Sequence, residues 1–106
     1  MKKQLKSSGN GYVLGFSKSL LKILGYDVTT VKVLLTVNND TLYIEPITPD
    51  DIEKYASNMV RKFQKNGGGY GLYFPNAIIE ILEINPDDDF LDIKINDNKL
   101  AIKKFI

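Results

Sequence analysis

Two glycine clusters, each preceded by a basic segment, are the residues of this sequence best suited to binding an anion. Gly9-Asn10-Gly11 follows residues 2–8, and Gly67-Gly68-Gly69 follows residues 60–66. Glycine allows another group to approach the backbone closely, backbone amides can hold phosphate oxygens, and basic side chains contact phosphates without sequence preference. The candidate phosphate contacts are the basic residues of both segments and of the first predicted helix, namely Lys2, Lys3, Lys6, Lys18, Lys22, Arg61, Lys62 and Lys65.

Two asparagines near the predicted contact surface are better suited to recognising a base. The side-chain amide of Asn10 or Asn76 can pair with adenine through two hydrogen bonds. The alternative is that both asparagines only cap turns, while the lysines keep the protein soluble. Tyr12, Tyr70 and Tyr73 lie close to the glycine clusters and can either stack on bases or belong to the core.

Catalysis and metal binding find little support in the sequence. The chain has no histidine and no cysteine, and no Ser/Lys or paired-carboxylate arrangement stands out, so we expect neither an enzyme nor a cofactor. Asp87, Asp88 and Asp89 are consecutive and point in different directions, which favours an acidic turn over a metal site. The glycine clusters lack the Gly-Lys-Ser/Thr ending of a P-loop.

Charge is distributed unevenly along a chain whose net charge is only +1. Residues 1–26 contain five lysines and no acid, a charge of +5, and residues 59–84 have a charge of +1. The remaining residues therefore sum to −5. The basic N-terminal stretches fit binding to a polyanion, although a solvated surface with scattered lysines explains the same charges.

The sequence repeats itself, without a gap, at an offset of 58 residues. Positions that recur include Gly11 and Gly69, Phe16 and Phe74, Asn38 and Asn96, and Ile44 and Ile102. We divide the chain into a first unit over residues 1–48, a connector over residues 49–58 and a second unit over residues 59–106. A unit of this size rarely buries enough apolar surface alone, so we expect a single domain with a shared core and an internal pseudo-twofold axis.

Each unit is predicted to contain a basic strand, a short strand after the glycine cluster, a helix and a hairpin. Ser17 and Pro75 are suitable residues for starting the two helices. Alternating apolar residues around Asn38-Asn39-Asp40 and Asn96-Asp97-Asn98 predict the hairpins.

The helix ends and the connector are predicted from turn and capping residues. Gly25 is expected to close the first helix, and Asn85-Pro86 the second. Thr48-Pro49-Asp50-Asp51 is typical of a helix start, with a proline and two acids in the first turn. We expect a helix from Pro49 to Met59, followed by a strand.

In this order of elements the chain resembles the AbrB/MazE/SpoVT family, transcription regulators and antitoxins of bacteria and archaea with a swapped-hairpin fold. Gly9-Asn10 matches the family's Gly-Asn, Phe16-Ser17-Lys18 its Ile-Pro-Lys, and Phe74-Pro75 the Ile-Pro of the second unit. Glu45-Pro46 ends the first hairpin, where the family has Arg-Pro. The resemblance implies a mainly β fold with short helices, in which tandem AbrB-like units form an intramolecular pseudo-dimeric β-barrel.

The resemblance also implies a function, that of a small cytoplasmic transcription regulator whose partner is double-stranded DNA. The basic N-terminal halves and the glycine loops of both units would contact the DNA. Many family members use an arginine before the Ile-Pro on DNA, but the corresponding residues here are Gly15 and Tyr73. Whether strong or sequence-specific DNA binding survives this departure from the family is left open by the sequence. Such a chain would act as a monomeric pseudo-dimer or as a further homodimer.

Two other functions stay open. The protein can be an interaction module or antitoxin that binds a toxin protein, with weak or no DNA binding. Family antitoxins have an acidic tail that this sequence does not show after the second hairpin, so the acidic connector at Asp50, Asp51 and Glu53 would have to bind the toxin. A repurposed fold that no longer binds DNA is the third possibility. No apolar stretch predicts a membrane span or signal peptide, and the lack of cysteine fits the cytoplasm.

Overall fold

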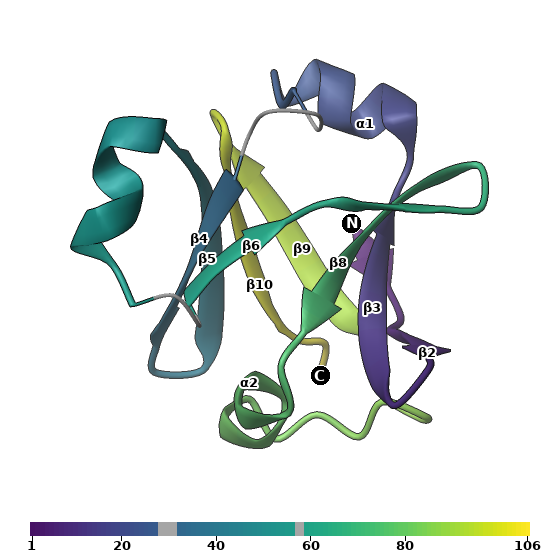
Figure 1. Ribbon diagram of the computed structural model, residues 1–106. Helices are drawn as coiled ribbons and strands as arrows, with labels where there is room; N and C mark the ends of the chain where they lie inside the picture. The colour runs from purple at the N-terminus through teal and green to yellow at the C-terminus, as the bar shows by residue number, and fades with distance from the viewer. Residues whose placement is uncertain (28–31, 57–58) are drawn as a thin grey trace.

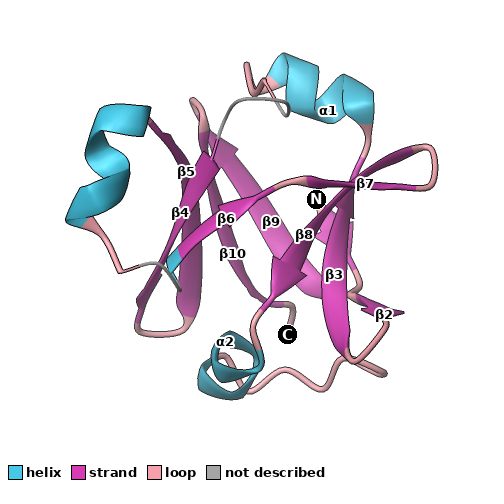
Figure 2. Cartoon of the chain, viewed as in Figure 1, coloured by secondary structure: helices cyan, strands magenta, loops and turns pink. Residues whose placement is uncertain are grey.

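Short antiparallel strands make up most of the structure, a computed structural model that describes residues 1–27, 32–56 and 59–106. The strands form two sheets, and short helices lie outside them (Figure 1, Figure 2). No helix in these ranges is long and apolar enough to cross a membrane. The prediction of a mainly β fold with short helices is confirmed.

The elements follow the predicted order in both halves of the chain. The first half contains β1 (Lys2–Lys3), β2 (Lys6–Ser8), β3 (Gly11–Phe16), α1 (Lys18–Ile23), β4 (Lys32–Asn38) and β5 (Thr41–Ile47). The 3-10 helix η1 (Pro49–Lys54) lies in the connector. The second half contains β6 (Val60–Lys62), β7 (Gln64–Asn66), β8 (Gly69–Phe74), α2 (Asn76–Ile81), β9 (Leu91–Asn96) and β10 (Lys99–Lys104).

Each sheet takes its strands from both halves of the chain. The six-stranded sheet has the order β1-β9-β10-β5-β4-β6, and the four-stranded sheet has the order β2-β3-β8-β7. β1 pairs with β9 of the second half, where Lys3 lies opposite Leu91, and β6 pairs with β4 of the first half, where Arg61 lies opposite Val33. The two halves therefore exchange their first strands, and the two exchanges have equivalent registers.

The backbone repeats as closely as the sequence. Every positive φ angle of the described residues belongs to a pair at the 58-residue offset: Gly9 with Gly67 (59° and 60°), Gly25 with Glu83 (77° and 55°), and Asn39 with Asp97 (59° and 56°). The last pair lies in the predicted hairpin turns, where asparagine and aspartate tolerate the left-handed region.

The two helices end at equivalent residues. Gly25 follows α1 as predicted, but α2 ends at Ile81, before the predicted Asn85-Pro86, and Glu83 takes the place of Gly25. The amide of Tyr26 donates to Leu21 O (2.9 Å), and the amide of Ile84 donates to Ile79 O (3.0 Å). These equivalent bonds satisfy helix-end carbonyls and terminate the two helices in the same way.

The connector helix is shorter than predicted. η1 ends at Lys54, and Tyr55 is already extended, with φ −119° and ψ 151°. None of the residues of η1 is buried, so no apolar face packs against the sheets to hold a longer helix. The predicted strand does follow, as β6, whereas residues 57–58 of the predicted helix lie outside the described residues.

The predicted closed barrel is not found among the described residues. β1 and β6 are the ends of the six-stranded sheet, and β2 and β7 are the ends of the four-stranded sheet. The chain crosses from one sheet to the other at Leu5 and at Phe63, both of which point into the core (5% and 3% exposed). These two equivalent crossings interrupt the strand pairing at the same place in each half, so the sheets stay open.

One hydrophobic core lies between the sheets. It contains residues of both halves, with Leu14, Leu72, Ile44 and Ile102 fully buried. The radius of gyration of 13.0 Å matches the value of about 13 Å expected for one domain of roughly 100 residues.

Candidate nucleic-acid interface

The four-stranded sheet buries one face and leaves the other for contacts. Leu14 and Phe16 of β3 and Leu72 and Phe74 of β8 are buried in the core. Because side chains alternate along a strand, positions 11, 13, 15, 69, 71 and 73 belong to the opposite face, and four of these six are glycine. The strands of this sheet contain no acidic residue. The result is an outer face with few side chains and no negative charge.

A cavity of about 430 Å³ opens at the end of this sheet where β3 leads into α1. Its lining includes Lys3 and Lys6, Gly15, and the turn Gly67–Gly69 between β7 and β8. The Lys3 Nζ donates to Gly15 O (2.9 Å), and the Lys6 side chain is exposed. Two lysines of the first half and the glycine cluster of the second half are thus brought together, as binding of a phosphate requires.

The cavity exists on one side of the pseudo-twofold axis because residue 15 is glycine. A Cβ on Gly15 would have no neighbour within 4 Å. At the equivalent position the ring of Tyr73 covers Gly11, where an added Cβ would lie 2.5 Å from Tyr73 Cε1. A smaller cavity of about 280 Å³ lies next to Tyr73 and is also lined by Lys65 and Gln64.

The helix α1 adds two further predicted residues at the same end of the sheet. Phe16 pairs with Tyr70, so the start of α1 lies beside the turn at Gly67–Gly69, and Figure 1 shows α1 and α2 at opposite ends of the molecule. Lys18 is in the first turn of α1 and Lys22 is in the last, and both are exposed.

The two predicted base-reading asparagines lie at the other end of the sheet. Tyr12 pairs with Phe74, which places Asn10 before β3 and Asn76 after β8 at the same end. Both side chains are exposed. The structure therefore brings these asparagines to one end and separates them from Lys18 and the larger cavity.

Two of the predicted contacts lie outside this surface. Lys2 in β1 places its Nζ 4.6 Å from the ring centroid of Phe90 and 4.4 Å from that of Phe105. Lys62 is exposed on β6, at the edge of the six-stranded sheet. Arg61 of the same strand places its guanidinium carbon 5.5 Å from the ring centroid of Tyr73 on β8. The prediction that all basic residues converge on one face is therefore only partly met.

The predicted basic residues make no ion pair within the described part of the chain. The lysines that do so are Lys54 with Asp51 (2.8 Å), Lys99 with Glu45 (3.1 Å) and Lys104 with Asp89 (3.6 Å). The hydrogen bond from Lys54 lowers the pKa of Asp51. Acidic residues of the connector, of β5 and of the turn before β9 thus pair with lysines of the connector and of β10, and not with the N-terminal lysines.

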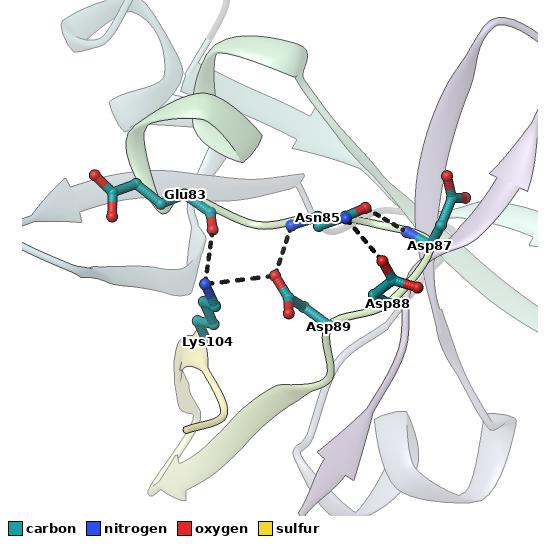
Figure 3. A network of polar contacts seen from close by, with 6 residues as sticks. All are labelled: Glu83, Asn85, Asp87, Asp88, Asp89 and Lys104. Atoms are coloured by element: carbon teal, nitrogen blue, oxygen red, sulfur yellow. Dashed lines mark hydrogen bonds and ion pairs between the residues drawn. The ribbon is translucent and has the colours of Figure 1, made fainter.

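The three consecutive aspartates form a hydrogen-bonded turn, seen in Figure 3. The Asn85 amide donates to Asp89 Oδ2 (2.7 Å), and Asn85 Nδ2 donates to Asp88 Oδ2 (2.9 Å). Asp89 also contacts Lys104, whose Nζ donates to Glu83 O (3.2 Å). Two of the three carboxylates are therefore engaged inside the turn, and no group of residues that can hold a metal ion occurs among the described residues.

Two features of the structure are not evident from the sequence. In the sequence, Gly15 stands out only as a departure from the family's arginine, whereas in the structure its missing side chain leaves the larger cavity open. Lys32 is not among the predicted contacts, yet it lies directly opposite Lys62, across β4 and β6. Only the register between distant strands brings these two lysines together, so no local sequence pattern could have indicated them.

No protein-family model, no curated protein and no solved structure matches this chain.

Proposed function

We propose that this protein binds double-stranded DNA through its phosphate backbone, using the four-stranded sheet and the lysine-lined cavity beside α1. The observation that supports this most is the convergence of Lys3, Lys6 and the turn Gly67–Gly69 on one cavity, beside a four-stranded sheet whose strands contain no acidic residue. A phosphate in this cavity would meet two cationic side chains and backbone that glycine leaves accessible.

The proposal includes the fold family. We propose that the chain is a fused pair of AbrB-like swapped-hairpin units, an intramolecular pseudo-dimer that acts as a transcription regulator. The exchange of β1 and β6 between the halves supports this, since each half completes the sheet of the other. The shared core and the matching turn angles also support it.

The contact surface in this proposal is asymmetric. Lys18 and Lys22 extend the basic end, whereas Asn10 and Asn76 occupy the opposite end of the sheet. The lysines would hold phosphates at one end, and the asparagines would approach a base edge at the other. A fused pair of this kind has no need of a palindromic target.

The test compares charge-removing variants in binding to a fluorescently labelled duplex at low salt. Lys6→Ala removes an exposed cation from the cavity, and Lys3→Ala removes the second. We expect the double variant to bind any duplex about tenfold more weakly, because phosphate contacts do not depend on sequence. The matched control replaces Lys94 and Lys103, which are exposed on β9 and β10, and should bind as the unmodified protein does. Equal affinity of both double variants would refute the assignment of the cavity.

A further inference from the structure

A second basic groove lies away from the proposed DNA surface, between the connector and the edge of the six-stranded sheet. Its volume is about 500 Å³. Lys32, Arg61 and Lys62 line it from β4 and β6, and Ile52, Glu53 and Tyr55 line it from η1 and the residue that follows η1. This volume falls within the range of about 300–1,000 Å³ that is typical of small-molecule sites.

Two lysines oppose each other in this groove without a carboxylate between them. Lys32 and Lys62 are direct cross-strand partners, and like charges in that position destabilise a sheet. Neither forms an ion pair within the described residues. The residues at the equivalent positions of the other half are Phe90 and Gln4, so the repeated fold does not require a pair of lysines here.

Arg61 does not add its charge to this pair. It lies opposite the buried Val33, so its side chain is on the other face of β6 from that of Lys62. Its guanidinium carbon lies 5.5 Å from the ring centroid of Tyr73. The positive charge of the groove therefore comes from Lys32 and Lys62, and an anionic ligand would relieve the repulsion between them.

The surroundings of the two lysines limit the kind of anion. Asp50, Asp51 and Glu53 of η1 are close in sequence to the groove-lining Ile52 and Tyr55, and their charges oppose a long polyanion such as DNA. Ile52 and the exposed Tyr55 offer an apolar wall of the kind that accepts a ring or a hydrocarbon body. A single phosphate joined to a small apolar group meets both conditions.

We infer that this groove binds a small phosphate monoester, with its phosphate on Lys32 and Lys62 and its organic body against Ile52 and Tyr55. This function is separate from DNA binding, and it removes Lys62 from the proposed DNA surface. Glu53 faces the same groove and disfavours ligands with a second negative group.

The inference is tested with the full chain by calorimetric and NMR titration of inorganic phosphate and phenyl phosphate at an ionic strength matched with sodium chloride. We expect both to bind, and phenyl phosphate to bind about tenfold more tightly, because its ring contacts Ile52 and Tyr55. Phosphate at about ten times its Kd should raise Tm by about 5 °C. A response that sodium chloride reproduces would overturn the inference.

Three variants locate the site. Lys32→Gln and Lys62→Gln should each weaken phenyl phosphate binding by about tenfold, since each removes a charge-assisted hydrogen bond. Glu53→Gln should strengthen binding about twofold to threefold by removing a nearby negative charge. Lys94→Gln, on the far strand β9, is the matched control and should bind phenyl phosphate as the unmodified protein does. Unchanged binding in both lysine variants would contradict the site.

DNA binding by the same variants separates this inference from the proposed function. Lys32→Gln with Lys62→Gln should leave affinity for a duplex unchanged. In Lys3→Ala with Lys6→Ala, the NMR shifts that phenyl phosphate causes at Ile52 and Tyr55 should stay unchanged. If the groove variants instead weaken duplex binding as much as the cavity variants do, the groove belongs to the DNA surface and the inference is wrong.

Discussion

Leu14 and Leu72 lie directly opposite each other on β3 and β8, and each is the counterpart of the other in the repeated sequence. On the other sheet Tyr43 lies opposite its own counterpart, Ala101. A pseudo-twofold axis that relates the two halves must therefore pass through both pairs. The repeat in the sequence therefore corresponds to a pseudo-twofold symmetry of the structure, and its axis passes through both sheets.

The central leucine pair gives the first prediction. Both side chains are fully buried, so Leu14→Ala and Leu72→Ala should each lower the free energy of unfolding by about 2–5 kcal/mol. Because their surroundings are equivalent, the two losses should agree to within about 1 kcal/mol. Urea denaturation followed by circular dichroism measures both. A large difference between the two variants would show that the halves are not energetically equivalent.

Glu83 gives a prediction of increased stability. Its φ of 55° is one that glycine adopts without strain, as Gly25 does at the end of α1. Its backbone carbonyl, and not its side chain, accepts the hydrogen bond from Lys104. Glu83→Gly should raise the free energy of unfolding by about 0.5–1 kcal/mol, and Gly25→Ala should lower it by about 1 kcal/mol. Thermal denaturation of the two variants checks both signs, and a destabilising Glu83→Gly would contradict the argument.

The cavity beside α1 can be closed by copying the arrangement of Tyr73 over Gly11. Gly15→Tyr should place a ring over Gly69 as Tyr73 covers Gly11, because the two positions are related by the pseudo-twofold axis. We expect the fold to persist and affinity for a duplex to fall about tenfold, since Lys3 and Lys6 lose access to a phosphate. Tyr73→Phe keeps the ring and should bind as the unmodified protein does. Anisotropy with a labelled duplex measures both, and full affinity of Gly15→Tyr would exclude the cavity as a contact.

The raised pKa of Tyr26 makes the stability of the fold depend on pH in the alkaline range. Burial, followed by the charge of Glu45, raises the pKa of Tyr26 to about 12, and its hydroxyl donates to Asn98 O. In the unfolded chain the tyrosine side chain ionises near pH 10. The raised pKa therefore stabilises the fold fully below pH 10, and this contribution is lost as the pH rises to about 12. Urea denaturation between pH 8 and 11 should show the fall. Tyr26→Phe should reduce that fall, and absorbance at 295 nm should show one tyrosine ionising later than the others.

Much of the fold could be predicted because its determinants are local or repeated. The hairpin turns at Asn39 and Asp97 and the closure of α1 at Gly25 follow from residues that favour positive φ. The end of α2 could not be predicted from residue type, since glutamate does not favour positive φ. Glu83 adopts it in a turn closed by the bond from the Ile84 amide to Ile79 O, and Lys104 from the end of the second hairpin donates to the Glu83 carbonyl.

The candidate site was harder to predict than the fold. The sequence indicated Lys3, Lys6 and the glycine clusters, but it could not show which lysines share a sheet. That depends on the crossings at Leu5 and Phe63, which bury an apolar side chain and send the flanking strands to different sheets. In the same way, Lys32 and Lys62 are cross-strand partners only because of the register between β4 and β6.

The measurement that tests the central proposal most directly is a salt titration of duplex binding. A labelled duplex from the region upstream of the gene and a scrambled duplex are titrated with the protein at about 50 and 200 mM salt. Contacts to four or five phosphates predict a loss of affinity of about a hundredfold or more over that range. Tighter binding to the upstream duplex would indicate an autoregulator. No binding at 50 mM salt, or binding that does not change with salt, would contradict the proposal that this protein holds DNA by its phosphates.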